Sequence, residues 1–174
     1  MRYQMRQKLF TLRDDFTIKD EFGRDVFRVI GRIFSFGKQL TFQTMDGQEV
    51  AFIRQQVMSW GPTYEIYRSG QLYATVKKNL FSFFNCSFEI DIPGPYDLKA
   101  EGDFSDHNYQ IVQGPNIIGF ISKQWFSWAD SYGVEIAPGG DDVLLLACTV
   151  VIDMACHEGG HESAGGLLGG LLDF

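Results

Sequence analysis

The strongest constraint on the fold of this chain is an apolar segment near its C-terminal end, residues 141–158, DDVLLLACTVVIDMACHE. It contains no Gly or Pro, and Asp153 is the only charged residue between its acidic start and Glu158. Acidic residues are typical of the first turn of a helix, and the Gly pair at 159–160 is typical of a helix end. The segment therefore predicts a helix at about 141–158.

The length of this helix limits where it can lie. Roughly sixteen residues make about 24 Å of helix, whereas a membrane span needs about 20 apolar residues. A single anchoring membrane helix is therefore the weaker alternative, and no transmembrane span is expected. A helix that is apolar on all sides must be surrounded by protein, and a sheet wrapped around it meets this requirement.

The rest of the chain consists of short alternating runs of apolar and polar residues, separated by turns that contain Gly. Such runs predict β-hairpins where two to five residues join them. Hairpins are expected at 16–20 with 25–31, 40–44 with 49–56, 64–68 with 72–78 and 109–113 with 117–123, and further strands at 8–12, 82–90, 96–104 and 132–136. The predicted fold is mainly β, a closed antiparallel barrel of about twelve strands around the central hydrophobic C-terminal helix, because closure removes exposed sheet edges. We expect one barrel domain at 1–158 and a flexible Gly-rich tail at 159–174.

The composition is typical of a soluble globular protein, with 45% hydrophobic and 21% charged residues. The three cysteines, Cys86, Cys148 and Cys156, are few and odd in number, which fits a reducing cytosol better than a disulfide scaffold. The N-terminal residues contain no apolar run typical of a signal peptide. The expected location is cytoplasmic, with peripheral attachment to a membrane as a further option.

The net charge of −7 is distributed unevenly along the chain. Residues 1–78 hold 13 of the 15 Lys and Arg but 8 of the 22 Asp and Glu, and residues 79–174 hold the remainder. A basic half can face an anionic partner. The alternative is that the two halves interleave in space, so that their charges mix.

Three segments resemble the LURP-one-related family. They are MRQKLFTLRDDFTIKDEFGRDVFRVIGRIFSFGKQLTF at 5–42, IIGFISKQWFSWADSYGVEI at 117–136 and LLLACTVVIDMACHE at 144–158. The family is similar in fold to the tubby C-terminal domain and the phospholipid scramblases, which implies about twelve antiparallel strands around a hydrophobic C-terminal helix. For function, the resemblance implies a choice between phosphoinositide binding, as in tubby domains, and calcium-linked lipid movement, as in scramblases. A shared fold alone does not decide between them.

Residues 157–161, HEGGH, match the H-E-x-x-H pattern of zinc metalloproteases. That chemistry needs both His on one face of a regular helix and a third ligand. Here two Gly residues lie where the helix is expected to end, and Ala164 and Leu167 stand where the extended pattern needs Gly and His. His107 is the only other histidine. We expect no metal site and no zinc.

The resemblance to scramblases also raises the question of a calcium site, because scramblases carry an acidic stretch just before the final helix. The matching residues here, 128–142, carry Asp130, Glu135, Asp141 and Asp142. Calcium takes six to eight oxygen ligands, and these four carboxylates have no EF-hand spacing. Asp141 and Asp142 are better interpreted as the start of the helix.

The best functional signal is a row of basic residues in GRDVFRVIGRIF, residues 23–34. Strand alternation places Arg24, Arg28 and Arg32 on one outward face, with apolar residues inward. Lys38 follows on the next strand. A row of Arg can hold phosphate groups through paired hydrogen bonds. The alternative is a solvated face whose Arg side chains pair with neighbouring acids.

Arg24, Arg28, Arg32 and Lys38 are therefore the candidate ligand-binding residues for lipid phosphate, and no catalytic residue is assigned. No nucleophile elbow, P-loop or dinucleotide-binding motif is present, so we expect a non-enzymatic binding module without a cofactor. The expected partner is an anionic lipid surface such as phosphoinositide headgroups. A protein-interaction or scaffold domain without lipid binding is the alternative, a calcium- or metal-dependent scramblase-like or hydrolytic activity is the weakest option, and no nucleic acid is expected.

Overall fold

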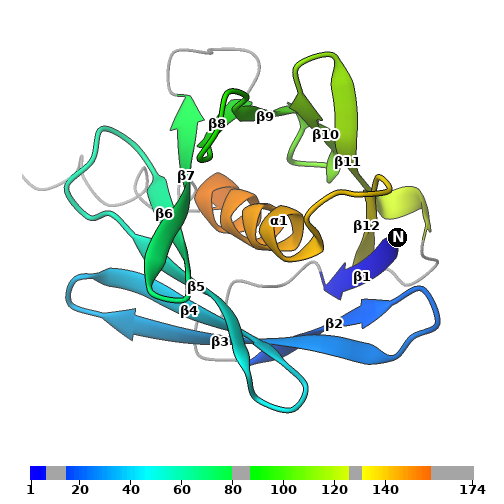
Figure 1. Ribbon diagram of the computed structural model, residues 1–174, viewed down its shortest axis with the longest axis horizontal. Helices are drawn as coiled ribbons and strands as arrows, with labels where there is room; N and C mark the ends of the chain where they lie inside the picture. The colour runs from blue at the N-terminus through cyan, green and yellow to red at the C-terminus, as the bar shows by residue number, and fades with distance from the viewer. Residues whose placement is uncertain (7–14, 80–86, 126–130, 158–174) are drawn as a thin grey trace, which may run out of the picture.

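The computed structural model describes residues 1–6, 15–79, 87–125 and 131–157. Within these residues the chain forms twelve strands, one short 3-10 helix and one α-helix (Figure 1). Their bounds are β1 Arg2–Arg6, β2 Phe16–Asp20, β3 Asp25–Phe34, β4 Gly37–Thr44, β5 Glu49–Gln55, β6 Thr63–Arg68, β7 Gln71–Asn79, β8 Ser87–Asp91, β9 Leu98–Asp103, β10 Asn108–Gln113, β11 Asn116–Ser122, η1 Lys123–Trp125, β12 Ser131–Ile136 and α1 Asp142–His157.

The strands form a closed antiparallel barrel in which each strand pairs with the next one along the chain. Closure comes from β1, which pairs with β2 on one side and with β12 on the other. Helix α1 lies inside the ring of strands (Figure 1). The predicted fold, a closed β-barrel around one C-terminal helix, is confirmed.

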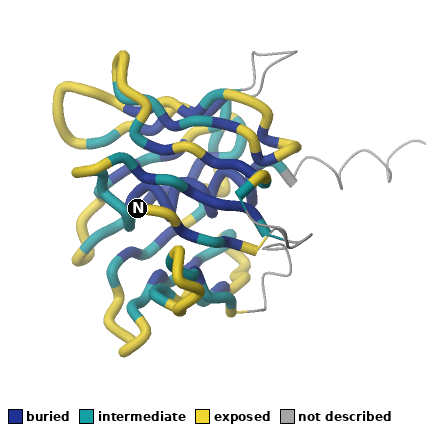
Figure 2. Tube along the Cα trace, turned by 90° about the vertical axis from the view of Figure 1, so that its right-hand side faces the viewer, coloured by how far each residue is buried: buried dark blue, intermediate teal, exposed yellow. Residues whose placement is uncertain are grey.

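Helix α1 is enclosed because its side chains are apolar on all sides and would otherwise be exposed to water. Leu145, Leu146, Val150 and Ile152 are each at most 1% exposed, and Figure 2 shows the buried residues at the centre of the molecule. Inward-facing strand residues complete the core, such as Leu40 and Phe42, which alternate with less buried neighbours along β4. No helix among the described residues is long and apolar enough to cross a membrane.

The four expected hairpins are present as β2–β3, β4–β5, β6–β7 and β10–β11. Strand β1 was not expected, although RYQMR alternates between polar and apolar residues over its whole length. The strand expected at 8–12 and the first part of the one expected at 82–90 lie outside the described residues, as does the tail from 158 onward.

Polar contacts from the barrel hold both ends of α1. At the N-terminal end, Asp141 accepts a hydrogen bond from the Leu144 amide at 3.1 Å and pairs with the Arg68 guanidinium at 2.7 Å. At the C-terminal end, the Lys78 ammonium donates to the Ala155 carbonyl at 3.2 Å. A carboxylate at the helix start and a cation at its end both suit the helix dipole. The expectation that Asp141 starts the helix is therefore met.

Asp153 has side-chain partners in the core of the barrel. The Tyr132 hydroxyl donates a hydrogen bond to Asp153, and the His107 Nε2 atom lies 3.3 Å from the other carboxylate oxygen. His107 and Asp153 are both at most 2% exposed. Burial, followed by the nearby Asp153 charge, raises the pKa of Tyr132 well above its usual value, so its hydroxyl remains a donor.

The barrel turns the uneven charge along the sequence into an uneven charge in space. Because neighbouring strands are consecutive in the chain, β1–β7 form one continuous arc and β8–β12 form the other (Figure 1). The first arc lies within the basic half of the chain and the second within the acidic half. Interleaving of the two halves, the alternative considered from the sequence, is therefore wrong for the strands.

Replacing a core residue of α1 with a charge tests the enclosed helix. Val150→Asp should prevent soluble folding, because an unpaired buried charge costs several kcal/mol and whole domains are stable by only about 5–15 kcal/mol. Thermal unfolding followed by circular dichroism measures this. The matched control is Ile117→Asp on β11, where the side chain is exposed and the same change should be tolerated. A Val150→Asp protein as stable as the Ile117→Asp protein would contradict the enclosed-helix arrangement.

The Asp141 contacts predict a loss of stability in acid. Burial alone would raise the pKa of the Asp141 carboxyl, but hydrogen bonds from Arg68 and the Leu144 amide hold the pKa below its usual value. Ionised Asp141 thus stabilises the fold above about pH 4, and this contribution is lost as the pH falls through the lowered pKa.

Asp141→Asn should lower the free energy of unfolding at pH 7 by about 1–3 kcal/mol, the usual range for a hydrogen bond to a charged group. It should also reduce the dependence of that free energy on pH below about pH 5. Urea unfolding at several pH values measures both effects. Asp91→Asn, at an exposed carboxyl on β8, is the control. An unchanged pH profile in Asp141→Asn would show that Asp141 does not carry this contribution.

Candidate functional site

A hollow opens in the barrel wall where β1 and β2 separate. The two strands pair only at Tyr3 with Asp20 and at Gln4 with Lys19. Beyond Gln4, β1 continues against β12, while β2 continues against β3. The end of β1 and the start of β2 therefore diverge, and between them lies a cavity of about 800 Å³, which we call the β1–β2 groove.

Three cationic side chains line the β1–β2 groove: Arg6 from β1, Lys19 from β2 and Arg28 from β3. Among the described lining residues, the only carboxylate is that of Asp15. The described lining thus has an excess of positive charge. Its remaining lining includes hydrogen-bonding side chains (Gln4, Thr17 and Ser131) and apolar ones (Met5, Phe16 and Met45).

Strand geometry explains why these cations meet. Arg6 and Gln4 lie on one face of β1, because Met5 between them points into the core. Lys19 is opposite Gln4, and Arg28 is opposite Thr17. Residues two apart on a strand share a face, so these side chains all project from the outer surface of three adjacent strands.

Two ion pairs cross the groove region. The Arg28 guanidinium lies 2.7 Å from an Asp15 oxygen, and the Lys19 ammonium lies 2.8 Å from Asp25. Hydrogen bonds from Lys19 and Thr17 hold the pKa of Asp25 below its usual value, so Asp25 stays ionised at neutral pH. Arg28 is half exposed. Exposed pairs of this kind contribute about 0–1 kcal/mol to stability, so an incoming anion can replace Asp15 on Arg28 at little cost. No acidic side chain pairs with Arg6 in the part of the chain that the structure describes.

The four residues proposed from the sequence do not form one cleft. Arg28 lines the groove, and Arg32 reaches the same Asp15 at 3.6 Å, so these two lie together. Arg24 lies in the turn before β3 and pairs with Asp20 at 2.6 Å. Lys38 lies near the opposite end of β3, where it pairs in register with Ile33. The eight residue-to-residue steps from Asp25 to Ile33 span about 26 Å of strand.

The sequence interpretation did not include Arg6, Asp15 or Lys19 in the site. Arg6 was missed because β1 was not expected. The alternating pattern of RYQMR was the available signal. The separation of β1 from β2 depends on pairing between the two ends of the chain, which no local pattern indicates.

Three of the four carboxylates considered for calcium have other polar partners. Glu135 pairs with Arg2 at 2.9 Å, Asp141 pairs with Arg68, and Asp142 accepts a hydrogen bond from Tyr3 at 2.6 Å. Among the described residues, no group of three or more His, Cys, Asp or Glu side chains is placed to hold a metal ion. His157 is the last residue of α1, whereas the rest of HEGGH, residues 158–161, and Asp130 lie outside the described residues.

A second, shallower hollow of about 400 Å³ lies on the acidic arc. Its lining includes Glu89, Asp91 and Asp97 against a single cation, Lys99. An anion would be repelled there. Of these two hollows, the β1–β2 groove is the one whose charges suit a phosphate or another anion, because Arg and Lys bind such groups through charge-assisted hydrogen bonds.

Comparison with known proteins identifies the family. The family model described as LURP-one-related matches residues 1–153. The Uncharacterized protein YxjI of Bacillus subtilis (strain 168) is 33% identical over 159 residues, which cover 91% of this chain and 96% of that protein. The X-ray structure of a protein from Arabidopsis thaliana is similar with a TM-score of 0.63 at 15% identity, covering 87% of this chain and 90% of that one, and at this identity it shows a shared fold alone. The resemblance noted in the sequence is confirmed, and the chain belongs to the LURP-one-related family.

Proposed function

We propose that this LURP-one-related protein is a non-enzymatic binding module for anionic lipid headgroups, with the β1–β2 groove as its binding site. The observation that carries the proposal is the convergence of Arg6, Lys19 and Arg28 around a cavity whose only described carboxylate is Asp15. A phosphorylated headgroup placed there would accept hydrogen bonds from all three cations. Its glycerol and first acyl carbons would lie against Phe16 and Met45.

The core of the barrel supports the non-enzymatic part of the proposal. His107, Asp153 and Tyr132 are the kind of residues that exchange protons in enzymes, but all three are at most 2% exposed. A general acid or base must come within hydrogen-bond reach of its substrate. The barrel wall and α1 seal these side chains away from any substrate, so they are best explained as a buried polar contact between β12 and the helix.

Charge reversal in the groove tests the proposal. The double variant Arg6→Glu with Arg28→Glu should bind vesicles that contain phosphoinositide or phosphatidylserine at least about tenfold more weakly than the wild type. Each basic residue near an anionic surface is worth about 1 kcal/mol, and 1.4 kcal/mol is tenfold in affinity. Vesicle co-sedimentation at low and high salt measures the effect. Wild-type binding should weaken at high salt, because exposed charges are screened.

The matched control is Lys99→Glu with Lys123→Glu, which makes the same change in net charge at partly exposed positions on the acidic arc. This variant should bind like the wild type, and both variants should keep the wild-type thermal stability. A soluble inositol phosphate should also compete with the vesicles for the protein. Such competition would show that the protein recognises the phosphate groups and not the acyl chains. If the groove variant binds as well as the control, or the wild type does not bind at low salt, the proposal fails and the protein-interaction alternative takes its place.

A further inference from the structure

A set of exposed apolar side chains extends from one end of the barrel on two neighbouring turns. The turn between β3 and β4 presents one group, and the loop between β5 and β6 presents the other. We call them together the apolar tip. Its members are Ile33, Phe34, Phe36, Val57, Met58 and Trp60.

The two turns of the apolar tip are in contact with each other. A Cβ atom on Gly37 would lie only 2.8 Å from the Val57 side chain, so the β3–β4 turn packs directly against the β5–β6 loop. The Lys38 amide donates a hydrogen bond to the Gln55 side chain at 3.1 Å, which fastens the two at their base. The two turns that carry the tip therefore lie side by side at their base.

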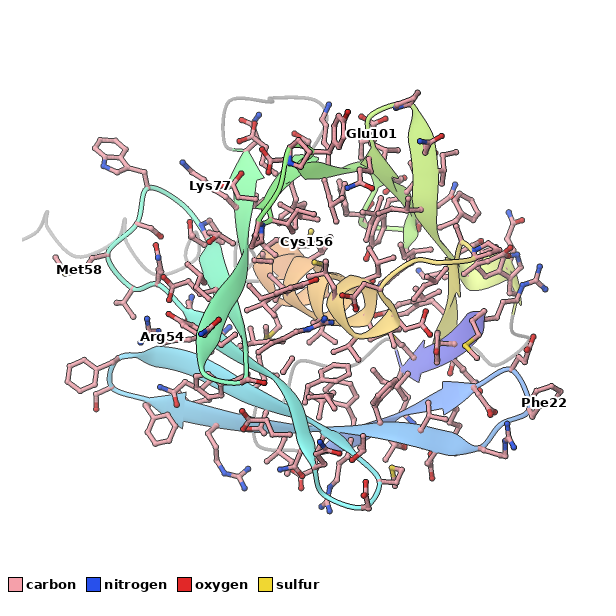
Figure 3. All side chains as sticks on the ribbon, in the orientation of Figure 1. Phe22, Arg54, Met58, Lys77, Glu101 and Cys156 are labelled. Carbon is pink, nitrogen blue, oxygen red and sulfur yellow. The ribbon has the colours of Figure 1, made fainter. Side chains whose placement is uncertain are left out.

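The exposure of the tip is extreme for residues of this kind. Met58 is 99% exposed, Trp60 is 92% exposed and Phe36 is 82% exposed. Figure 3 shows Met58 at the margin of the molecule, pointing away from the barrel. Single exposed apolar residues are normal, but a contiguous group marks a surface that contacts a partner or a membrane.

Basic residues flank the apolar tip. Residues 26–45 and 50–64, which contain both turns, hold Arg28, Arg32, Lys38 and Arg54 and no Asp or Glu, and Arg54 pairs with Glu65 of β6 at 2.7 Å. Apolar side chains surrounded by basic ones fit an anionic bilayer, where the apolar groups enter the acyl region and the cations stay among the headgroups. Trp60 suits this position in particular, because an indole combines an apolar ring with a hydrogen-bond donor.

We propose that the apolar tip is a membrane-insertion element that docks the barrel on an anionic bilayer. The tip adjoins the β1–β2 groove, because Arg32 contacts Asp15 of the groove and directly precedes Ile33 of the tip. Docking through the tip would bring the groove to the headgroup layer. This inference goes beyond the proposed function, since the tip contacts the acyl region whereas the groove contacts the headgroup.

A second copy of this chain is a less suitable occupant of the tip. A symmetric dimer through this surface would bring the same patch of each subunit together. Arg32 and Lys38 of one copy would then approach the same cations of the other. Like charges placed against each other oppose association, whereas an anionic bilayer attracts them.

Removal of the tip's apolar side chains provides the first test. The triple variant Phe36→Ser, Met58→Ser, Trp60→Ser should reduce binding to phosphatidylserine-containing vesicles at least about tenfold, while thermal stability stays at the wild-type value because all three side chains are exposed. The matched control is Leu72→Ser, Tyr96→Ser, Ile117→Ser, which removes three exposed apolar side chains elsewhere on the barrel. The control should bind like the wild type.

Fluorescence of Trp60 provides the second test. The protein has three tryptophans, so Trp125→Phe with Trp128→Phe leaves Trp60 as the only one. On addition of phosphatidylserine vesicles, its emission should shift to shorter wavelength, and lipids brominated on the acyl chains should quench it. An unshifted, unquenched Trp60 in vesicle-bound protein would overturn the inference.

The outcomes separate this inference from the proposed function. Loss of binding in the tip variant together with full binding of Arg6→Glu, Arg28→Glu would support insertion and reject the groove. The reverse pattern would reject insertion and support the groove. A wild-type dimer in solution that the tip variant converts to a monomer, with no vesicle binding, would reject the inference in favour of self-association. A monomer that does not bind vesicles would reject it in favour of a protein partner.

Discussion

The fold depends on burial of α1 inside the barrel. A barrel of eight strands is about wide enough for its own side chains to fill, and the diameter grows with strand number. A twelve-stranded barrel therefore needs additional filling, and α1 supplies it with a helix whose apolar residues face every direction. The dependence is mutual, because a helix of this kind cannot be exposed to water. Neither the sheet nor the helix has a satisfactory alternative, which explains why a chain of short strands adopts one arrangement.

The order of the strands determines how charge is distributed around this barrel. Each strand lies beside the next one in the chain, so any gradient along the sequence becomes a gradient around the barrel. The basic first half becomes a basic arc and the acidic second half an acidic arc. In a fold with crossover connections the same sequence would have mixed its charges. The electrostatic face of the protein is thus a consequence of topology as much as of composition.

Local patterns predicted most of the fold but little of the site. Each hairpin is visible as two alternating runs around a Gly-containing turn, and α1 is visible from its apolar length. The prediction that the three Arg side chains share one face was only partly right. Alternation assigns a residue to a face of the sheet only if that residue lies within the strand. Strand β3 begins at Asp25, and Arg24 belongs to the preceding turn, where Asp20 holds it. The groove could not be predicted from local sequence, since it exists because β1 leaves β2 to follow β12, a pairing between residues more than 120 positions apart.

The junction of β1 and β2 is the least paired seam of the described barrel. It also holds the more cationic of the two hollows described above, and the separation of the two strands accounts for both features. Two residue pairs join β1 to β2, whereas five join β1 to β12. A fully paired seam would have brought Arg6 and Arg28 onto a continuous outer face with no space between their strands. Because the strands separate, they form fewer backbone hydrogen bonds with each other and leave a cavity between them. At the edge of this cavity Arg28 and Arg32 share one carboxylate, that of Asp15. Two guanidinium groups thus share one acid, so the positive charge of this described pair exceeds the negative charge of Asp15.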